Sequence, residues 1–293
     1  MLESLNIFKK PKTSKLSYEL DDLSKKYLAT SARKNIQKAV DFADKAHDGQ
    51  FRKSGEPFLI HPINVGIILA GLKMDGDTIV AGLLHDVVED CEISLKEVKK
   101  LFGKNVSNLV NGVTKLLQLD EKLIDQGQAE YFQKMALATA EDVRVVIIKL
   151  ADRLHNLKTI EHLPRDKQIK KSKETLELYA PLAHQIGMHK MATDLEDISF
   201  KTLHPIRYEL IKDALKKNDL SRKSMISKVK KVLKTKFREN NIDVKITGRE
   251  KRIFSIYQKM KAKKTSFSDI YDVFAFRVVV KNAGDCYRSL GLI

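Results

Sequence analysis

The stretch Ala81 to Asp90, AGLLHDVVED, places one histidine and three carboxylates close together on the chain. Glu89 lies four residues beyond His85, and Asp90 lies four beyond Asp86, so on a helix the four side chains project from adjacent faces of one turn. Like charges this close repel one another, and each acid at a helix C-terminus opposes the dipole by roughly 0.3–1 kcal/mol. A bound divalent cation removes both objections, and an exposed acidic helix end is the alternative.

Two residues elsewhere extend this group into a mixed set of nitrogen and oxygen donors. His61 stands at the start of the preceding helical segment, and Asp152 lies in KLADRLHN after a long apolar run. Two imidazoles and two carboxylates suit Mn²⁺, Fe²⁺ or Zn²⁺ better than Ca²⁺. A second His-Asp dipeptide, His47-Asp48, precedes a Gly-Gln turn, and we interpret it as a helix-end pair. His61, His85, Asp86 and Asp152 are therefore candidate metal ligands, although spacing alone does not decide it.

Helical periodicity supplies the elements that must position these residues. Apolar residues three or four apart predict helices near 35–49, from His61 onward, and from an N-cap at Asp77 through the acidic stretch. The loop FRKSGEPF, at 51–58, separates the first two. The run Val143 to Ile160 begins like a strand because of its β-branched residues, but its length favours a buried helix. Up to about residue 204 we expect an all-α fold.

The net charge and the pattern of apolar residues change in the last third of the chain. Residues 201–264 carry 21 Lys and Arg against 6 Asp and Glu, so the net charge of +16 is almost entirely local. Two amphipathic helices are predicted there, at 205–217 and 221–240, and their default interpretation is a solvated face rather than a phosphate-binding one. DVKITG and VFAFRVVV then predict strands of an α/β domain, which we expect to be incomplete because the chain stops at the apolar SLGLI.

Composition limits the class of protein. The length of 293 residues allows about two domains, and 43% hydrophobic with 31% charged residues is typical of a globular protein. The N-terminus is polar and no apolar run approaches about 18 residues, so we expect a cytoplasmic protein without a membrane span. Cys91 and Cys286 lie far apart without CxxC spacing, which argues against disulfides or a cysteine-rich zinc site. The sequence indicates no oligomeric state.

Several motifs together resemble the RelA/SpoT family of alarmone enzymes, within the HD superfamily of metal phosphohydrolases. HDGQFRKSGEPFLIHP, AGLLHDVVED, KLADRLHNLKT and YAPLAHQIGM stand in the family's order and spacing, and GREKRIFSIYQKM and IYDVFAFRV extend the resemblance. The resemblance implies a mainly α chain that ends in the first part of an α/β domain. The implied parts are an N-terminal extension (1–30), an HD-type hydrolase domain (31–204), a basic helical connector (205–240) and an incomplete synthetase domain (241–293).

The resemblance also implies an activity and its residues. The reaction would be hydrolysis of guanosine tetra- and pentaphosphate (ppGpp and pppGpp) at the 3′ position, giving GDP or GTP and pyrophosphate. The four candidate ligands would hold one Mn²⁺, which activates water, and Glu89 and Asp90 would act on that water. The implied substrate contacts are Arg52, Lys53 and Asn156. A guanidinium can stack on guanine, and an ammonium or a guanidinium can meet phosphate.

A second set of residues matches the family's synthetase site. Arg249, Lys251, Ser255 and Lys259 would contact ATP at the start of a helix, and Asp272 would bind Mg²⁺ in a complete synthetase domain. Arg252 and Phe254 depart from the His and Tyr that are common in the family. The resemblance places the remaining synthetase strands, a second metal-binding acid and the GDP/GTP acceptor site beyond Ile293, so we do not expect this chain to make alarmone.

Two alternatives stay open. The chain could be an inactive regulatory module whose basic segment 205–264 binds RNA, a ribosome or another domain, although its intact motifs count against this. It could also hydrolyse another nucleotide pyrophosphate. Contact with a ribosome or regulatory protein through the family's C-terminal region is a further implication. His155 belongs to the family's LHN signature but could equally cap or pack, and three further histidines lie in helical surroundings without acidic partners at ligand spacing, namely His184, His189 and His204.

Overall fold

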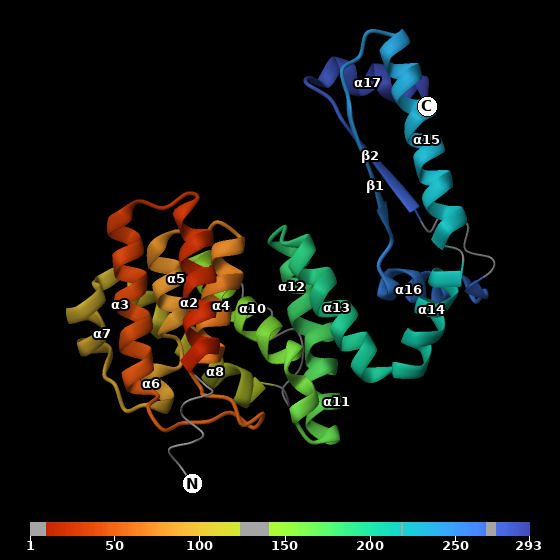
Figure 1. Cartoon of the computed structure of the whole chain (residues 1–293). Coiled ribbons are helices and arrows are strands. Elements are labelled where there is room, and N and C mark those ends of the chain that lie inside the picture. Colours follow the sequence, from red (N-terminus) through yellow and green to blue (C-terminus); the bar gives the residue numbers. More distant parts are fainter. Residues whose placement is uncertain (1–9, 124–140, 218, 268–273) are drawn as a thin grey trace. The chain divides into compact units, whose positions relative to one another are not determined.

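The structure is a computed structural model that describes residues 10–123, 141–217, 219–267 and 274–293 (Figure 1). The chain divides into two compact units, Met1–Leu195 and Glu196–Ile293. Strands in the described residues occur only in the second unit, so the predicted mainly α fold is confirmed. The predicted domain bounds near residues 30, 204 and 240 stay predictions.

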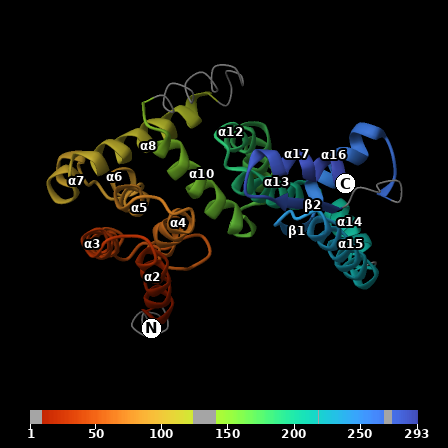
Figure 2. The ribbon, with the colours of Figure 1, turned by 90° about the horizontal axis from the view of Figure 1, so that it is seen from above.

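The first unit is a bundle of helices around α4 (Ile60–Gly71) and α5 (Gly76–Leu83). Figure 2 shows α2 (Lys10–Lys25) and α3 (Thr30–Ala46) on one side of this pair, and α8 (Lys104–Leu123) and α10 (Val143–Lys158) on the other. The remaining helices of this unit are α6 (Val87–Asp90), α7 (Leu95–Phe102), η1 (Ile160–His162), α11 (Arg165–Glu174), η2 (Thr175–Tyr179), α12 (Ala180–Gln185) and the start of α13 (His189–Leu203).

The core of the first unit is formed where α4, α5 and α10 meet. Its fully buried side chains include Ile63, Val65, Leu69, Ile79, Val80, Leu83, Ile148 and Leu150. A Cβ added at Gly82 would overlap the end of the Leu69 side chain and force it to move, so glycine lets α5 approach α4 closely here. The close approach matters because α4 and the residues that follow α5 carry three of the candidate ligands.

The prediction of one helix running through Asp90 is wrong. The helix α5 ends at Leu83, and α6 begins only at Val87, so His85 and Asp86 lie in the break between them. Nδ1 of His85 hydrogen-bonds the carbonyl of Gly82 at 2.8 Å, which supplies a partner for one of the terminal carbonyls of α5. Periodicity did not reveal the break because residues on both sides of it are buried.

The predicted N-cap of α5 is also wrong by two residues. Asp75 is the N-cap, and its carboxylate accepts hydrogen bonds from the main-chain N–H of Thr78 at 3.0 Å and from the Thr78 hydroxyl at 2.6 Å. Asp77 lies inside the first turn instead. Either aspartate is a plausible cap in DGDT, and only Asp75 has the extended backbone that a cap requires.

The apolar run that begins at Val143 forms the buried helix α10, as predicted. Its N-cap is Asp142, whose carboxylate accepts a hydrogen bond from the main-chain N–H of Arg144 at 3.0 Å. Buried side chains occur on all sides of α10, which explains why its sequence shows little amphipathic period. The helix therefore carries Asp152 through the interior of the bundle.

The second unit contains the basic helices and the two strands. Its elements after α13 are α14 (Pro205–Lys217), α15 (Asp219–Glu239), β1 (Lys245–Glu250), α16 (Ile253–Lys263), β2 (Phe274–Val279) and α17 (Ala283–Leu292). The strands pair antiparallel, with Lys245 opposite Val279 and Glu250 opposite Phe274. Phe237, Ile242 and Ile246 form a small core between α15 and this sheet. No helix in the described residues is long and apolar enough to cross a bilayer.

The capping contact gives a direct test of where α5 begins. We expect Asp75→Ala to lower the free energy of unfolding by about 1 kcal/mol, because it leaves the Thr78 N–H without its acceptor. Asp77→Ala removes a favourable charge in the first turn and an exposed hydrogen bond from Asn105 but no capping contact, and it serves as the matched control. Urea unfolding followed by circular dichroism measures both, and an equal or larger effect of Asp77→Ala would contradict the assignment.

Candidate metal centre

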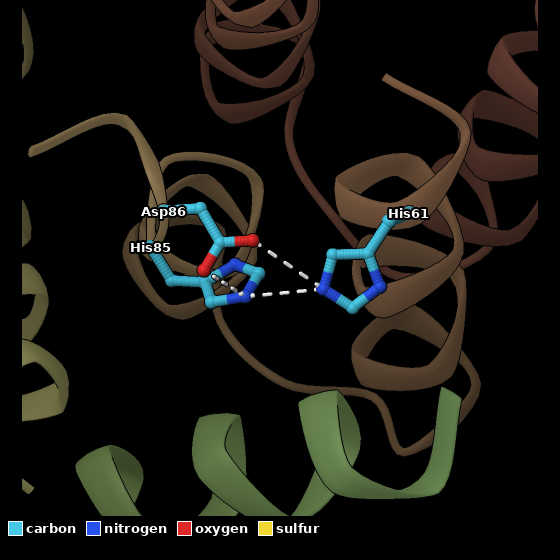
Figure 3. A group of neighbouring side chains, drawn as sticks. All are labelled: His61, His85 and Asp86. Atoms are coloured by element: carbon cyan, nitrogen blue, oxygen red, sulfur yellow. Dashed lines mark hydrogen bonds and ion pairs between the residues drawn. The ribbon is translucent and has the colours of Figure 1, made fainter. Parts of the chain in front are cut away.

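Three candidate ligands converge at the break between α5 and α6. Nε2 of His61, on α4, lies 3.3 Å from Nε2 of His85. The Asp86 carboxylate lies against both rings, with one oxygen 2.9 Å from Nε2 of His85 and the other 3.5 Å from Nε2 of His61. One donor atom from each residue lies within 4.8 Å of the others. Figure 3 shows the His85 ring and the Asp86 carboxylate facing the His61 ring across the gap between their segments.

Asp152 brings the fourth donor from α10. Its Oδ1 lies 3.2 Å from Nε2 of His61 and 3.8 Å from Nε2 of His85. Its other oxygen faces the Lys149 ammonium at 3.6 Å, and both of these side chains are buried. The structure therefore brings together all four residues that the sequence suggested as ligands.

Hydrogen bonds fix which nitrogen of each ring faces this point. The Gly82 carbonyl can only accept, so Nδ1 of His85 carries a proton, and Nε2 presents a lone pair when the ring is neutral. Nδ1 of His61 lies 2.7 Å from Nδ1 of His155, which also faces Nη1 of Arg52 at 3.2 Å. Because a guanidinium only donates, Nδ1 of His155 is an acceptor, and Nδ1 of His61 donates to it.

The charge state of His155 agrees with this assignment. Burial, together with the neighbouring His61 and Arg52, lowers the pKa of His155 to about 3, so the ring is neutral. Burial lowers the pKa of His61, so this ring is neutral as well and has its lone pair on Nε2. Two imidazole lone pairs and two carboxylates then point at one place, which is a donor set that fits a divalent metal ion.

The carboxylates favour positive charge at this place. Burial alone would lower the pKa of His85, but the Asp86 and Asp152 carboxylates raise it well above its usual value, so a proton on Nε2 competes with a metal ion for this position. Burial would likewise raise the pKa of Asp152, but hydrogen bonds with His61 and His85 hold it well below its usual value. Both carboxylates are thus kept ionised, as metal ligands must be.

Glu89 and Asp90 lie on the single turn of α6, with exposed side chains. Partial burial and the nearby Asp86 charge raise the pKa of both carboxyl groups. Neither carboxylate has a hydrogen-bond partner within the described part of the chain. Carboxylates with raised pKa beside a metal site are suited to accept a proton from water.

The loop between α3 and α4 reaches the site through Arg52. Nη2 of Arg52 donates to Oδ1 of Asn156 at 2.6 Å, and Nδ2 of Asn156 donates to Oδ1 of Asp152 at 2.5 Å. Two of the predicted substrate contacts, Arg52 and Asn156, are therefore in contact with each other and connected to a metal ligand. Lys53 is exposed on the same loop.

His155 is a site residue that sequence reasoning missed. The sequence leaves a role in the LHN signature and simple capping or packing equally open, whereas in the structure the His155 ring contacts both His61 and Arg52. The available signal was its position three residues after Asp152, on adjacent turns of the same helix. That spacing is equally common in packed cores, so it could not separate the two roles.

The residues of the predicted ATP site lie in the second unit. Ser255 and Lys259 occupy one face of α16, and Lys251 lies between β1 and α16. The side chain of Arg249 and all of Asp272 lie outside the described residues. The start of α16 already has an anion, because the Asp197 carboxylate accepts a hydrogen bond from the main-chain N–H of Phe254 at 3.0 Å.

The helical bundle and its two histidines and two aspartates define an HD-type domain. Residues 39–189 match the family model of the HD domain, and residues 248–293 match the region found in RelA / SpoT proteins. The chain belongs to the RelA/SpoT homologues of the HD domain family.

Its relatives carry names for both halves of alarmone metabolism. The chain is 44% identical over 272 residues to the bifunctional (p)ppGpp synthase/hydrolase SpoT of Escherichia coli (strain K12), covering 93% of this chain and 39% of that protein. It is 43% identical over 274 residues to a guanosine-3′,5′-bis(diphosphate) 3′-pyrophosphohydrolase of Vibrio cholerae, covering 94% and 39%. A GTP pyrophosphokinase of Myxococcus xanthus is 41% identical over 261 residues, covering 88% and 34%. The chain thus spans about two fifths of these relatives' length.

The contact between His61 and His155 predicts an effect on metal affinity. We expect His155→Ala to weaken Mn²⁺ binding about 10–100-fold, because residues that orient a metal-binding histidine typically carry that factor. His162→Ala, a half-exposed histidine on η1, is the control and should leave affinity unchanged. Calorimetric titration of metal-free protein measures both. Equal affinities for the wild type and His155→Ala would show that His61 does not need this partner.

Proposed function

We propose that this chain is a metal-dependent hydrolase that removes pyrophosphate from the 3′ position of guanosine tetra- and pentaphosphate, releasing GDP or GTP. The observation that carries the proposal is the convergence of two imidazole Nε2 atoms and two carboxylates from α4, α10 and the α5–α6 break. The names of the pyrophosphohydrolase relatives support the substrate. An inactive binding module is less well supported, since it would not need a complete donor set.

We propose Mn²⁺ as the ion that His61, His85, Asp86 and Asp152 hold. A bound divalent ion would supply Lewis acidity, which lowers the pKa of water and offsets negative charge on the phosphoryl group. The four residues act by holding their donor atoms in place, and the buried rings are kept in the required tautomer by Gly82 and His155. Fe²⁺ and Zn²⁺ suit the same donors and are the competitors to test.

The remaining residues divide between proton transfer and substrate binding. Glu89 and Asp90 are proposed to take the proton from the attacking water or to orient it, since neither carboxylate has a hydrogen-bond partner among the described residues and the pKa of each is raised. Arg52 and Asn156 are proposed to bind the nucleotide, with Lys53 meeting phosphate. Arg52 is held against α10 by His155 and Asn156, so its guanidinium is already oriented before substrate arrives.

Synthetase activity is not proposed for this chain, and Mg²⁺ and ATP would matter only to a complete synthetase domain. The proposed substrate derives from the nucleotide pool, so the proposal places the chain in the cytoplasm. Contacts with a ribosome or a regulatory protein stay predictions.

The proposal predicts release of pyrophosphate from ppGpp when Mn²⁺ is present, and no release with excess chelator. Asp86→Asn should lower turnover by at least about 10²-fold, because a carboxamide lacks the charge that both His85 and a metal require. Asp48→Asn changes the other His-Asp dipeptide, whose aspartate is exposed, and should turn over like the wild type. Unchanged turnover in Asp86→Asn would sink the proposal.

A panel of nucleotides and metals separates the alternatives. Faster pyrophosphate release from another nucleotide pyrophosphate would change the substrate while keeping the chemistry. Salt-sensitive RNA binding with no hydrolysis, under any of Mn²⁺, Mg²⁺ or Zn²⁺, would favour the binding module instead. Product identification by chromatography distinguishes cleavage at the 3′ position from cleavage elsewhere.

A further inference from the structure

The four-residue helix α6 needs support from outside itself. One turn of helix is not stable alone, and its last carbonyls have no partner within the helix. The carbonyl of Asp90 is one of these, and Nε2 of Gln50 donates to it at 3.3 Å. Gln50 therefore caps the turn that carries Glu89 and Asp90, from a position 40 residues earlier in the chain.

Gln50 is also the base of the loop that carries Arg52 and Lys53. Its main-chain carbonyl accepts a hydrogen bond from Phe58 at 3.0 Å, and Phe51 and Pro57 pair in a β-bridge just inside this contact. Within the loop, the main-chain N–H of Arg52 donates a hydrogen bond to the main-chain carbonyl of Glu56 at 2.9 Å. The loop is thus closed on itself, and a shift of Gln50 moves its whole base.

His47 fixes the orientation of the Gln50 amide. Nε2 of Gln50 donates to a carbonyl, so Oε1 is the acceptor and receives a hydrogen bond from Nδ1 of His47 at 2.8 Å. The His47 ring is buried and stacks on Phe58 with ring centroids 4.4 Å apart. Phe58 in turn meets the ring of His61 edge-on at 6.2 Å. His47 is therefore held by the end of the same loop.

We propose that His47 and Gln50 are a positioning pair that fixes the distance between the Glu89-Asp90 turn and the Arg52-Lys53 loop. The inference rests on the proposed function, because it assigns the turn to proton transfer and the loop to substrate binding. Neither His47 nor Gln50 touches the donor atoms of the four metal ligands in the described contacts. The pair therefore sets the position of the water-activating groups relative to the substrate-binding groups.

The test is removal of the Gln50 hydrogen bonds with little change of volume. Gln50→Met should lower kcat and raise KM together, reducing kcat/KM by about 10–100-fold, since misplacement by about 1 Å can cost 10² in rate. Mn²⁺ affinity should be unchanged. Gln50→Glu keeps the acceptor for His47 but loses the donor to Asp90, and should behave like Gln50→Met. The control is Gln37→Met on α3, whose amide bonds only the exposed Asp41.

A double variant separates positioning from general destabilisation. If Gln50 acts on substrate binding through the loop, Gln50→Met/Arg52→Ala has a KM no higher than Arg52→Ala alone. Additive increases in KM, or wild-type kinetics in Gln50→Glu, would overturn the proposal.

Hydrogen exchange tests the positioning role of His47 and Gln50 independently of the proposed function. Gln50→Met should speed amide exchange in 51–58 and 87–91 together, by about 2–10-fold, the factor that one net hydrogen bond carries. Gln37→Met should leave both segments unchanged. A wild-type protein that releases no pyrophosphate refutes the proposed function alone, whereas unchanged exchange in Gln50→Met refutes the positioning pair.

Discussion

The structure of the first unit depends on one constraint, which is that two buried imidazoles must present unprotonated nitrogens to the same point. Each ring meets this constraint by giving its other nitrogen to a fixed acceptor, the Gly82 carbonyl for His85 and the neutral His155 ring for His61. Without those acceptors neither ring would be held in one tautomer, and either an N–H or a lone pair of each ring could face the carboxylates of Asp86 and Asp152. The partners of the ligands are therefore as necessary to the site as the ligands.

The break between α5 and α6 follows from the same constraint. Consecutive residues on a regular helix point about 100° apart, so His85 and Asp86 could not both face His61 from one continuous helix. Interrupting the helix lets both side chains turn toward α4, as Figure 3 shows, and leaves the acids on a separate short turn. That turn is then too short to hold itself, which is why a contact such as the one from Gln50 to the Asp90 carbonyl is needed.

The parts of the site that could be predicted from sequence are those that depend on residue type and on the periodic spacing of apolar residues. The helices follow apolar spacing, and His61, His85, Asp86 and Asp152 were found because such residues are unusual on apolar segments. The break at His85, the cap at Asp75 and the role of His155 were missed. Each depends on a local hydrogen bond whose partner is not marked by any periodicity. The Gln50 contact joins segments 40 residues apart through a main-chain carbonyl, which leaves no pattern in sequence at all.

The distribution of charged residues along the chain implies that binding of a polyanionic substrate depends on a few local contacts. The basic excess of the chain lies in residues 201–264, whereas residues 1–200 carry 30 Lys and Arg against 29 Asp and Glu. The first unit thus has no general positive field to attract a guanosine polyphosphate. Its attraction must come from a bound cation and a few placed groups, of which Arg52 is oriented by α10 and Lys53 is exposed beside it. A site that depends on so few cations is sensitive to where each one stands, and this is why the base of the loop and the acidic turn are held together.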